Sequence, residues 1–156
     1  MSERTESNGG EIEPSFTEED LRRECYPNKC AVWCVTILYG LTRQNYDSIL
    51  TEAERIKEDG VGLNIAETCQ LGRAFSLFDG YTSYKYILNN DTIEDVSQVI
   101  SKIRELNNNG KLNKSIICVD DHCAIGKSLD GKYVYVNNVN PTETRYDTIN
   151  VRGVIY

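Results

Sequence analysis

The chain has 156 residues, of which 40% are hydrophobic and 26% are charged, a composition that predicts one soluble domain with a single core. No run approaches the ~18 consecutive apolar residues that a membrane-spanning helix requires, so we expect no membrane span. The net charge is −7, but residues 1–24 alone contribute −5, and the rest of the chain is close to neutral. This balance argues against nucleic-acid binding, because the phosphate backbone is bound by a basic surface.

The six cysteines are expected to be reduced thiols. The start of the chain has neither the basic nor the apolar region of a secretory signal, and no two cysteines have the C-x-x-C spacing of common zinc sites. The missing signal predicts a reducing compartment, most simply the cytoplasm. Cys34 and Cys118 lie inside apolar runs, so we expect them to be buried as small hydrophobic residues.

The N-terminal part of the chain predicts a leader followed by helices. Residues 1–16 are polar and lack apolar periodicity, which predicts a disordered acidic leader before a single domain over residues 17–156. Thr17 and Asp20 have the spacing of a capping box and predict a short helix. That helix is expected to end at Pro27.

A strongly apolar helix is expected next, with Asn28 as its N-cap. Its apolar residues recur at helical spacing, which predicts one broad buried face formed by Cys30, Trp33, Cys34, Ile37, Leu38 and Leu41. Three more helices are predicted, over residues 46–56, 63–75 and 92–106.

After residue 110 the pattern changes to strands. A β-branched run at 115–119 predicts one strand, and a last strand is expected within residues 148–156. Between them, residues 122–128 and 132–136 flank an Asp-Gly pair and predict a hairpin. Helices followed by an antiparallel sheet indicate an α+β fold whose helical half comes first.

The only histidine limits the chemistry that the chain can perform. A thiol nucleophile needs a base that shares its proton near neutral pH, and His122 is the only imidazole available. Its expected partner is Cys30, in the first turn of the apolar helix, where backbone amides and the helix dipole favour a thiolate. The same amides can contribute to an oxyanion hole.

The other cysteines are weaker candidates for the nucleophile. Cys34 lies one turn deeper in the helix, and Cys25 precedes it. Cys123 is expected to point to the face of its strand opposite to His122. A zinc site is a further alternative, although the spacing matches no common zinc motif; its ligands would come from Cys25, Cys30, Cys34, His122 and Cys123.

A third group is expected to orient the imidazole by accepting its second N–H. The strand after the hairpin ends in consecutive asparagines. Asn138 shares the face of the valines at 134 and 136, which are expected to face the core, and is the preferred candidate. Asn137 remains the candidate if a bulge shifts the alternation.

The order of these residues resembles that of papain-like cysteine peptidases. A cysteine opens a buried helix (CAVWCVTIL, from residue 30), a helical middle follows, a histidine starts a strand (HCAIG, from residue 122), and an asparagine comes sixteen residues later, after YVYVNN. The chain looks most like small members of the superfamily, such as bacteriocin-processing peptidase domains and bacterial effector or viral leader proteases. The resemblance covers residues ~24–156 and implies a nucleophile helix packed on a C-terminal antiparallel sheet.

The resemblance also implies site residues and an activity. Cys30 looks like the nucleophile, His122 the general acid and base, and Asn138 the orienting residue of a protease that acts on a protein or peptide without cofactor or metal. Family members place a glutamine six residues before the cysteine as an oxyanion donor, whereas this chain has Glu24 there, so Asn28 or another group is expected to donate instead, unless the match is out of register. Asn28 itself lies six residues before Cys34, which keeps Cys34 open as the nucleophile.

Two alternatives to a protease remain. The same three residues fit a glutamine deamidase, and the loss of the glutamine donor fits a non-catalytic binding module. The resemblance to effector proteases also leaves open delivery into a host cell without a classical signal peptide.

Overall fold

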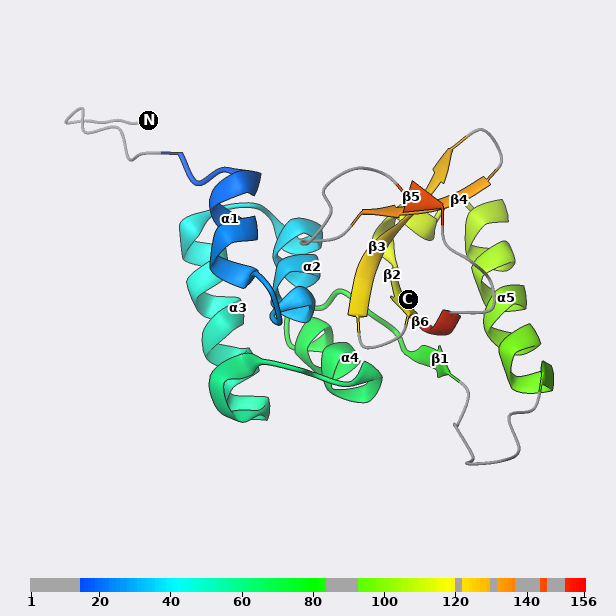
Figure 1. The fold of residues 1–156 in the computed structure, drawn as a ribbon, viewed down its shortest axis with the longest axis horizontal. Helices are drawn as coiled ribbons and strands as arrows, with labels where there is room; N and C mark the ends of the chain where they lie inside the picture. Colours follow the sequence, from blue (N-terminus) through cyan, green and yellow to red (C-terminus); the bar gives the residue numbers. More distant parts are fainter. Residues whose placement is uncertain (1–14, 84–92, 120–121, 130–131, 137–143, 146–150) are drawn as a thin grey trace.

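The computed structural model describes residues 15–83, 93–119, 122–129, 132–136, 144–145 and 151–156, and these form an α+β fold, as predicted (Figure 1). Most of the expected leader lies outside the described residues. The helices are α1 (Glu18–Cys25), α2 (Cys30–Tyr39), α3 (Arg43–Ile56), α4 (Ile65–Arg73) and α5 (Ile93–Asn108), with short 3₁₀ helices η1 (Glu58–Gly60) and η2 (Leu112–Lys114). The strands are β1 (Tyr81–Ser83), β2 (Ile116–Val119), β3 (His122–Leu129), β4 (Lys132–Val136), β5 (Thr144–Arg145) and β6 (Val151–Ile155).

Capping side chains fix where three of the helices begin. The capping box predicted for α1 is confirmed, because the Thr17 hydroxyl accepts the Asp20 N–H at 3.1 Å and the Asp20 carboxylate accepts the Thr17 N–H at 3.0 Å. Asn64 and Glu67 form the same arrangement at the start of α4. Thr42 caps α3, which therefore begins three residues before the predicted start.

The strands form one antiparallel sheet in the order β1-β6-β2-β3-β4-β5. The predicted hairpin is confirmed by the pairing of Leu129 with Lys132, which leaves two residues for the turn. The strands β1 and β5 were not predicted, and β1 precedes α5 in the chain. The expectation of helices first and strands second is therefore wrong for β1, which joins the sheet by pairing with β6.

Both faces of the sheet are covered by helices. On one face, Ile116, Cys118 and Ile155 belong to the core that includes the buried residues of α1–α4. On the other face, Ile117, Val151 and Val154 pack with residues of α5 (Val99, Ile103 and Leu106). The strand residues in these two cores have relative exposures of 0–4%, so the sheet is the shared wall of two apolar cores.

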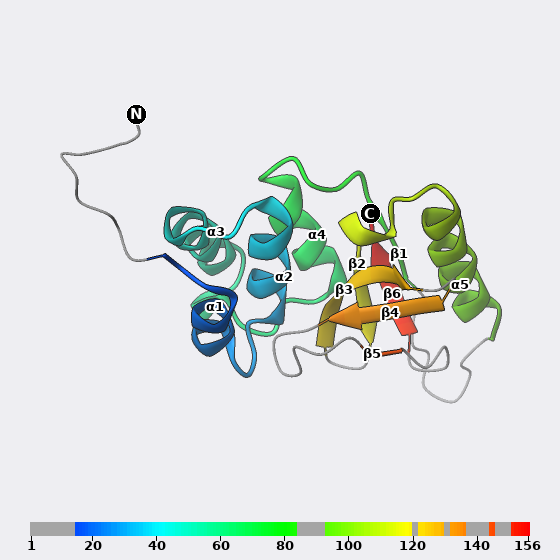
Figure 2. The ribbon, with the colours of Figure 1, turned by 90° about the horizontal axis from the view of Figure 1, so that it is seen from above.

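The two ribbon views agree on the order of the layers (Figures 1 and 2). α1 and α3 lie outermost, α2 and α4 come next, the sheet follows, and α5 covers its far side. α2 contacts α1, α3, α4 and β3, and every residue from Ala31 to Thr36 is buried. The prediction of a single buried face for α2 is therefore wrong, because other elements cover this helix on several sides.

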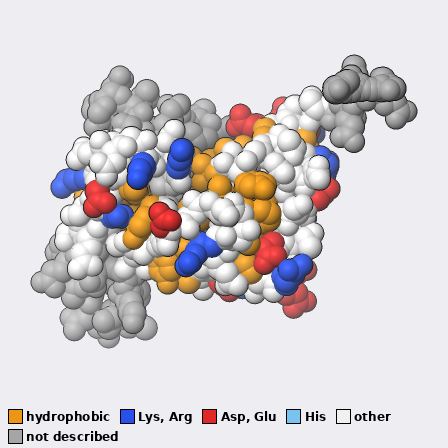
Figure 3. Space-filling model, turned by 180° about the vertical axis from the view of Figure 1, so that it is seen from behind, with side chains coloured by type: hydrophobic (Ala, Val, Ile, Leu, Met, Phe, Trp, Pro, Cys, Tyr) orange, Lys and Arg blue, Asp and Glu red, His pale blue; other side chains and the backbone are white. Residues whose placement is uncertain are grey.

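The outer surface has no concentration of one charge on the face drawn in Figure 3. Acidic and basic side chains are scattered over this face, with apolar side chains exposed between them. Among the residues that the structure describes, no helix has the length and apolar character needed to cross a membrane.

Candidate functional site

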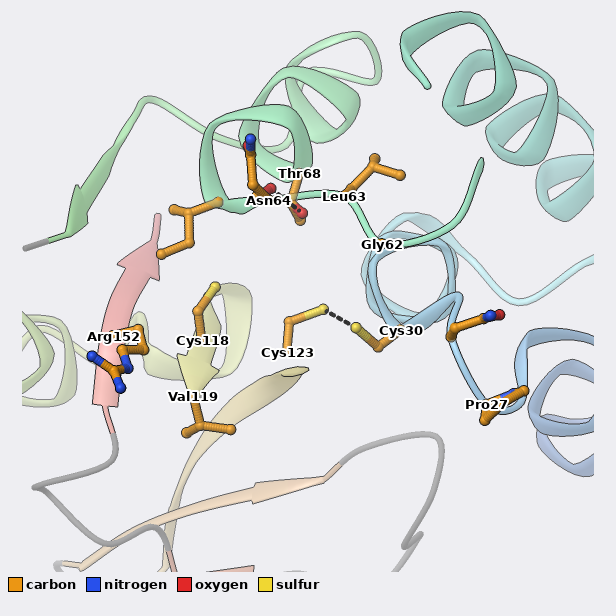
Figure 4. Close-up of a pocket in the computed structure, with 12 residues that line it drawn as sticks. Pro27, Cys30, Gly62, Leu63, Asn64, Thr68, Cys118, Val119, Cys123 and Arg152 are labelled. Carbon is orange, nitrogen blue, oxygen red and sulfur yellow. Dashed lines mark hydrogen bonds between the residues drawn. The ribbon is translucent and has the colours of Figure 1, made fainter. Parts of the chain in front are cut away.

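A cavity of about 360 Å³ lies where the starts of α2 and α4 approach β2, β3 and β6 (Figure 4). Its lining is mixed, with apolar side chains, three polar side chains, one arginine and three thiols. The residues are Pro27, Asn28, Cys30, Gly62, Leu63, Asn64, Ile65, Thr68, Cys118, Val119, Cys123 and Arg152. Two predicted site residues, Cys30 and Asn28, therefore line one cavity.

Cys30 is the first residue of α2 and is half-buried at the cavity wall. The other five cysteines of the chain are buried, with relative exposures of 0–4%. Cys30 is thus the thiol that combines a helix N-terminus with access to a cavity, the environment in which a thiolate is stabilised.

The start of α2 lacks a capping side chain, unlike the starts of α1, α3 and α4. The N-cap is Lys29, so the prediction of Asn28 as the cap is wrong. The turn after α1 explains the difference, because the Lys29 N–H donates to the Cys25 carbonyl at 2.9 Å and positions Lys29 at the cap. The positive end of α2 is therefore not occupied by a capping side chain and faces the cavity.

Three thiols meet beside the cavity. The Cys123 Sγ donates to the Cys30 Sγ at 2.9 Å, and the Cys34 Sγ lies 4.0 Å from the Cys123 Sγ (Figure 4 draws the first contact). Cys123, a weaker candidate because it was expected on the strand face opposite to His122, therefore lies on the α2 side of the sheet. Cys123 lies directly opposite Cys118 on the neighbouring strand β2, and both residues belong to the core on the α2 side.

The environments of the buried thiols disfavour charge on them. Burial raises the pKa of Cys34, against a smaller lowering by its hydrogen bond with Cys123. The hydrogen bond with Cys30 lowers the pKa of Cys123, but the bond with Cys34 together with burial outweighs it, so this pKa lies well above its usual range. Burial also raises the pKa of Cys118, and raises that of Cys25 to about 12. Cys30 is the member of the cluster that is half-exposed at the cavity wall.

The predicted base and orienting residues are described only in part. His122 is the first residue of β3 and pairs with Val119, directly before Cys123; its side chain lies outside the described part of the structure. Asn137 and Asn138 also lie outside the described residues.

Glu24, at the position where the family has glutamine, is engaged away from the cavity. It is an exposed residue of α1, its carboxylate lies 3.7 Å from the Arg43 guanidinium, and it does not line the cavity. Asn28 does line it, and the Asn28 carbonyl accepts the Gly62 N–H at 3.2 Å, which joins the loop before α2 to the segment before α4.

Cys118, Asn64, Thr68 and Arg152 were not predicted to line a site. They come from β2, α4 and β6, and nothing local in the sequence marks them, because only the packing of distant elements brings them together. The zinc alternative gains no support, since the described side chains contain no group of three or more ligands arranged to hold a metal ion.

The chain was also compared with known proteins. No protein-family model, curated protein or solved structure matches it.

Proposed function

We propose that the protein is a cysteine-dependent amide hydrolase of papain-like fold with Cys30 as its nucleophile. Cys30 attacks the substrate carbonyl, and His122 takes the thiol proton and passes it to the leaving amine. Water then hydrolyses the thioester and regenerates the thiol. Asn138, or Asn137, orients the imidazole. A peptide bond as substrate makes the enzyme a protease, which we favour over deamidation of a glutamine side chain.

The observation that carries the proposal is the position of Cys30. It combines the uncapped start of α2, partial exposure and a cavity wall. The start of β3 lies against this residue, because Cys123 contacts Cys30 and His122 directly precedes Cys123. Because neighbouring residues of a strand point to opposite faces, this contact places the backbone of His122 near Cys30 without directing its side chain there. The pairing of Cys30 with His122 is therefore part of the proposal, and the alkylation experiment tests it.

The surroundings of Cys30 support an acyl-transfer role. The amide groups at the start of α2 can hold the oxyanion that forms when the thiolate attacks. Arg152 lines another part of the cavity wall. Leu63, Ile65 and Val119 supply apolar contacts for a peptide side chain.

The pH dependence of alkylation tests whether Cys30 is an activated thiol. In the intact protein, treated with iodoacetamide and analysed by mass spectrometry of its peptides, Cys30 is expected to react fastest at and below pH ~7. The buried thiols should react slowly, because they are shielded and their pKa values are raised. His122→Ala is expected to slow the labelling of Cys30 at this pH and to leave the other five unchanged.

Equal, slow labelling of all six cysteines, unaffected by His122→Ala, would instead favour the non-catalytic binding module. Fast labelling of Cys34 ahead of Cys30 would move the nucleophile to Cys34.

The role of Asn28 is tested separately. With hydrolysis of a fluorogenic peptide library as the assay, Asn28→Ala is expected to lower kcat by roughly 10²-fold, the usual cost of one oxyanion donor. Glu24→Ala is the matched control, and its expected change is under about threefold, because Glu24 contacts Arg43 and not the cavity. Equal losses in the two variants would argue against Asn28 as a donor.

A further inference from the structure

We infer that Cys30 and Cys123 form a peroxide-sensitive dithiol, in which Cys123 is the resolving thiol for oxidised Cys30. The inference rests on the thiol cluster itself and not on the proposed hydrolysis. Its members are Cys30 on α2, Cys123 on β3 and, behind them, Cys34.

The distances favour one pair within this cluster. The Sγ atoms of Cys30 and Cys123 are 2.9 Å apart, and a disulfide joins sulfurs at about 2.05 Å, so the two atoms need to approach by less than ~1 Å. The Sγ atoms of Cys34 and Cys123 are 4.0 Å apart. Cys34 is also completely buried, whereas Cys30 lines the cavity. A small oxidant in the cavity therefore reaches Cys30 first, and the thiol in contact with Cys30 is that of Cys123.

Hydrogen peroxide is the oxidant in the proposed reaction and accepts the two electrons that the thiols lose. The Cys30 thiolate attacks one peroxide oxygen, the O–O bond breaks, and Cys30 becomes a sulfenic acid while hydroxide leaves and takes up the thiol's proton as water. The Cys123 sulfur then attacks the Cys30 sulfur, and the sulfenic oxygen leaves as a second water with the Cys123 proton. Two thiols lose two electrons in total, and one peroxide is reduced to two waters.

The consequence for function follows from the site. A disulfide at Cys30 removes the proposed nucleophile reversibly, and it protects that sulfur from irreversible oxidation to sulfinic acid. This consequence depends on the proposed function, whereas the formation of the disulfide does not.

Peptide mapping of the full chain tests the inference without an activity assay. After treatment with dilute hydrogen peroxide and alkylation of the remaining thiols, a peptide pair joined through Cys30 and Cys123 is expected, and it should disappear on treatment with dithiothreitol. A dominant link from Cys30 to Cys34 or Cys25, or sulfinic acid at Cys30 with no link in the wild-type protein, would overturn the inference.

Two variants sharpen the test. Cys123→Ala is expected to convert the linked product into sulfinic acid at Cys30, because no resolving thiol remains in contact with the sulfenic acid. Cys69→Ala is the matched control, since Cys69 is a buried thiol of α4 that does not line the cavity, and it should leave the Cys30–Cys123 link unchanged. If Cys123→Ala does not fold, the linked wild-type peptide still decides the question. If the wild-type protein forms the Cys30–Cys123 link but hydrolyses no peptide, that result would count against the proposed function and not against the dithiol.

Discussion

Cys30→Ala is expected to reduce hydrolysis of a fluorogenic peptide library by on the order of 10⁴-fold or more, because the proposed thioester forms on the Cys30 sulfur. The fold should persist, since Cys30 is half-buried and its replacement removes one sulfur atom from a cavity wall. Circular dichroism and the urea midpoint check the fold, and kcat/KM checks the activity.

Cys69→Ala is the matched control for this experiment as well. It removes a thiol that is 3% exposed, on α4 and outside the cavity lining, so it is expected to retain activity within about threefold. Full activity in Cys30→Ala would reject Cys30 as the nucleophile. Loss of activity in Cys34→Ala, with Cys30→Ala active, would favour Cys34.

The largest expected effects on stability are at two neighbouring residues of β2. Ile116→Ala and Ile117→Ala are each expected to lower the free energy of unfolding by about 2–5 kcal/mol, because both side chains are completely buried. Ile116 packs in the core on the α2 side, and Ile117 packs in the core formed with α5. Urea unfolding followed by circular dichroism measures both values, provided that the slope of the transition is unchanged.

The comparison of the two variants tests whether α5 covers the second face of the sheet. Ser101→Ala, at an exposed position of α5, is the control and is expected to change the free energy of unfolding by less than about 0.5 kcal/mol. A small loss for Ile117→Ala beside a large loss for Ile116→Ala would mean that α5 does not bury that face in solution.

Local patterns in the sequence were enough to predict several elements. The side chains of Thr17 and Asp20 each accept the backbone N–H of the other residue. This signal is carried within four residues, and α1 begins where it predicts. The hairpin of β3 and β4 was predicted by the Asp-Gly pair for the same reason. Cys30 was predicted to open a helix because an apolar periodic segment follows the break at Pro27, and α2 begins at that residue.

The short strands could not be predicted, because their stability comes from distant partners. β1 has three residues, and it pairs with β6, so that Tyr81 lies opposite Ile155. The close packing there requires glycine: a Cβ on Gly153 would come within 2.9 Å of the Thr82 carbonyl oxygen. No local sequence pattern contains that requirement.

The sequence by itself determined the helix that Cys30 opens, the strand that His122 starts, and the set of six thiols from which any nucleophile must come. Only the tertiary structure decided which side chain of β3 faces α2. Alternation along a strand is a local property, but its phase is set by the neighbouring strand. Here β2 pairs Cys118 with Cys123 and packs both against the helical core, so Cys123 contacts Cys30.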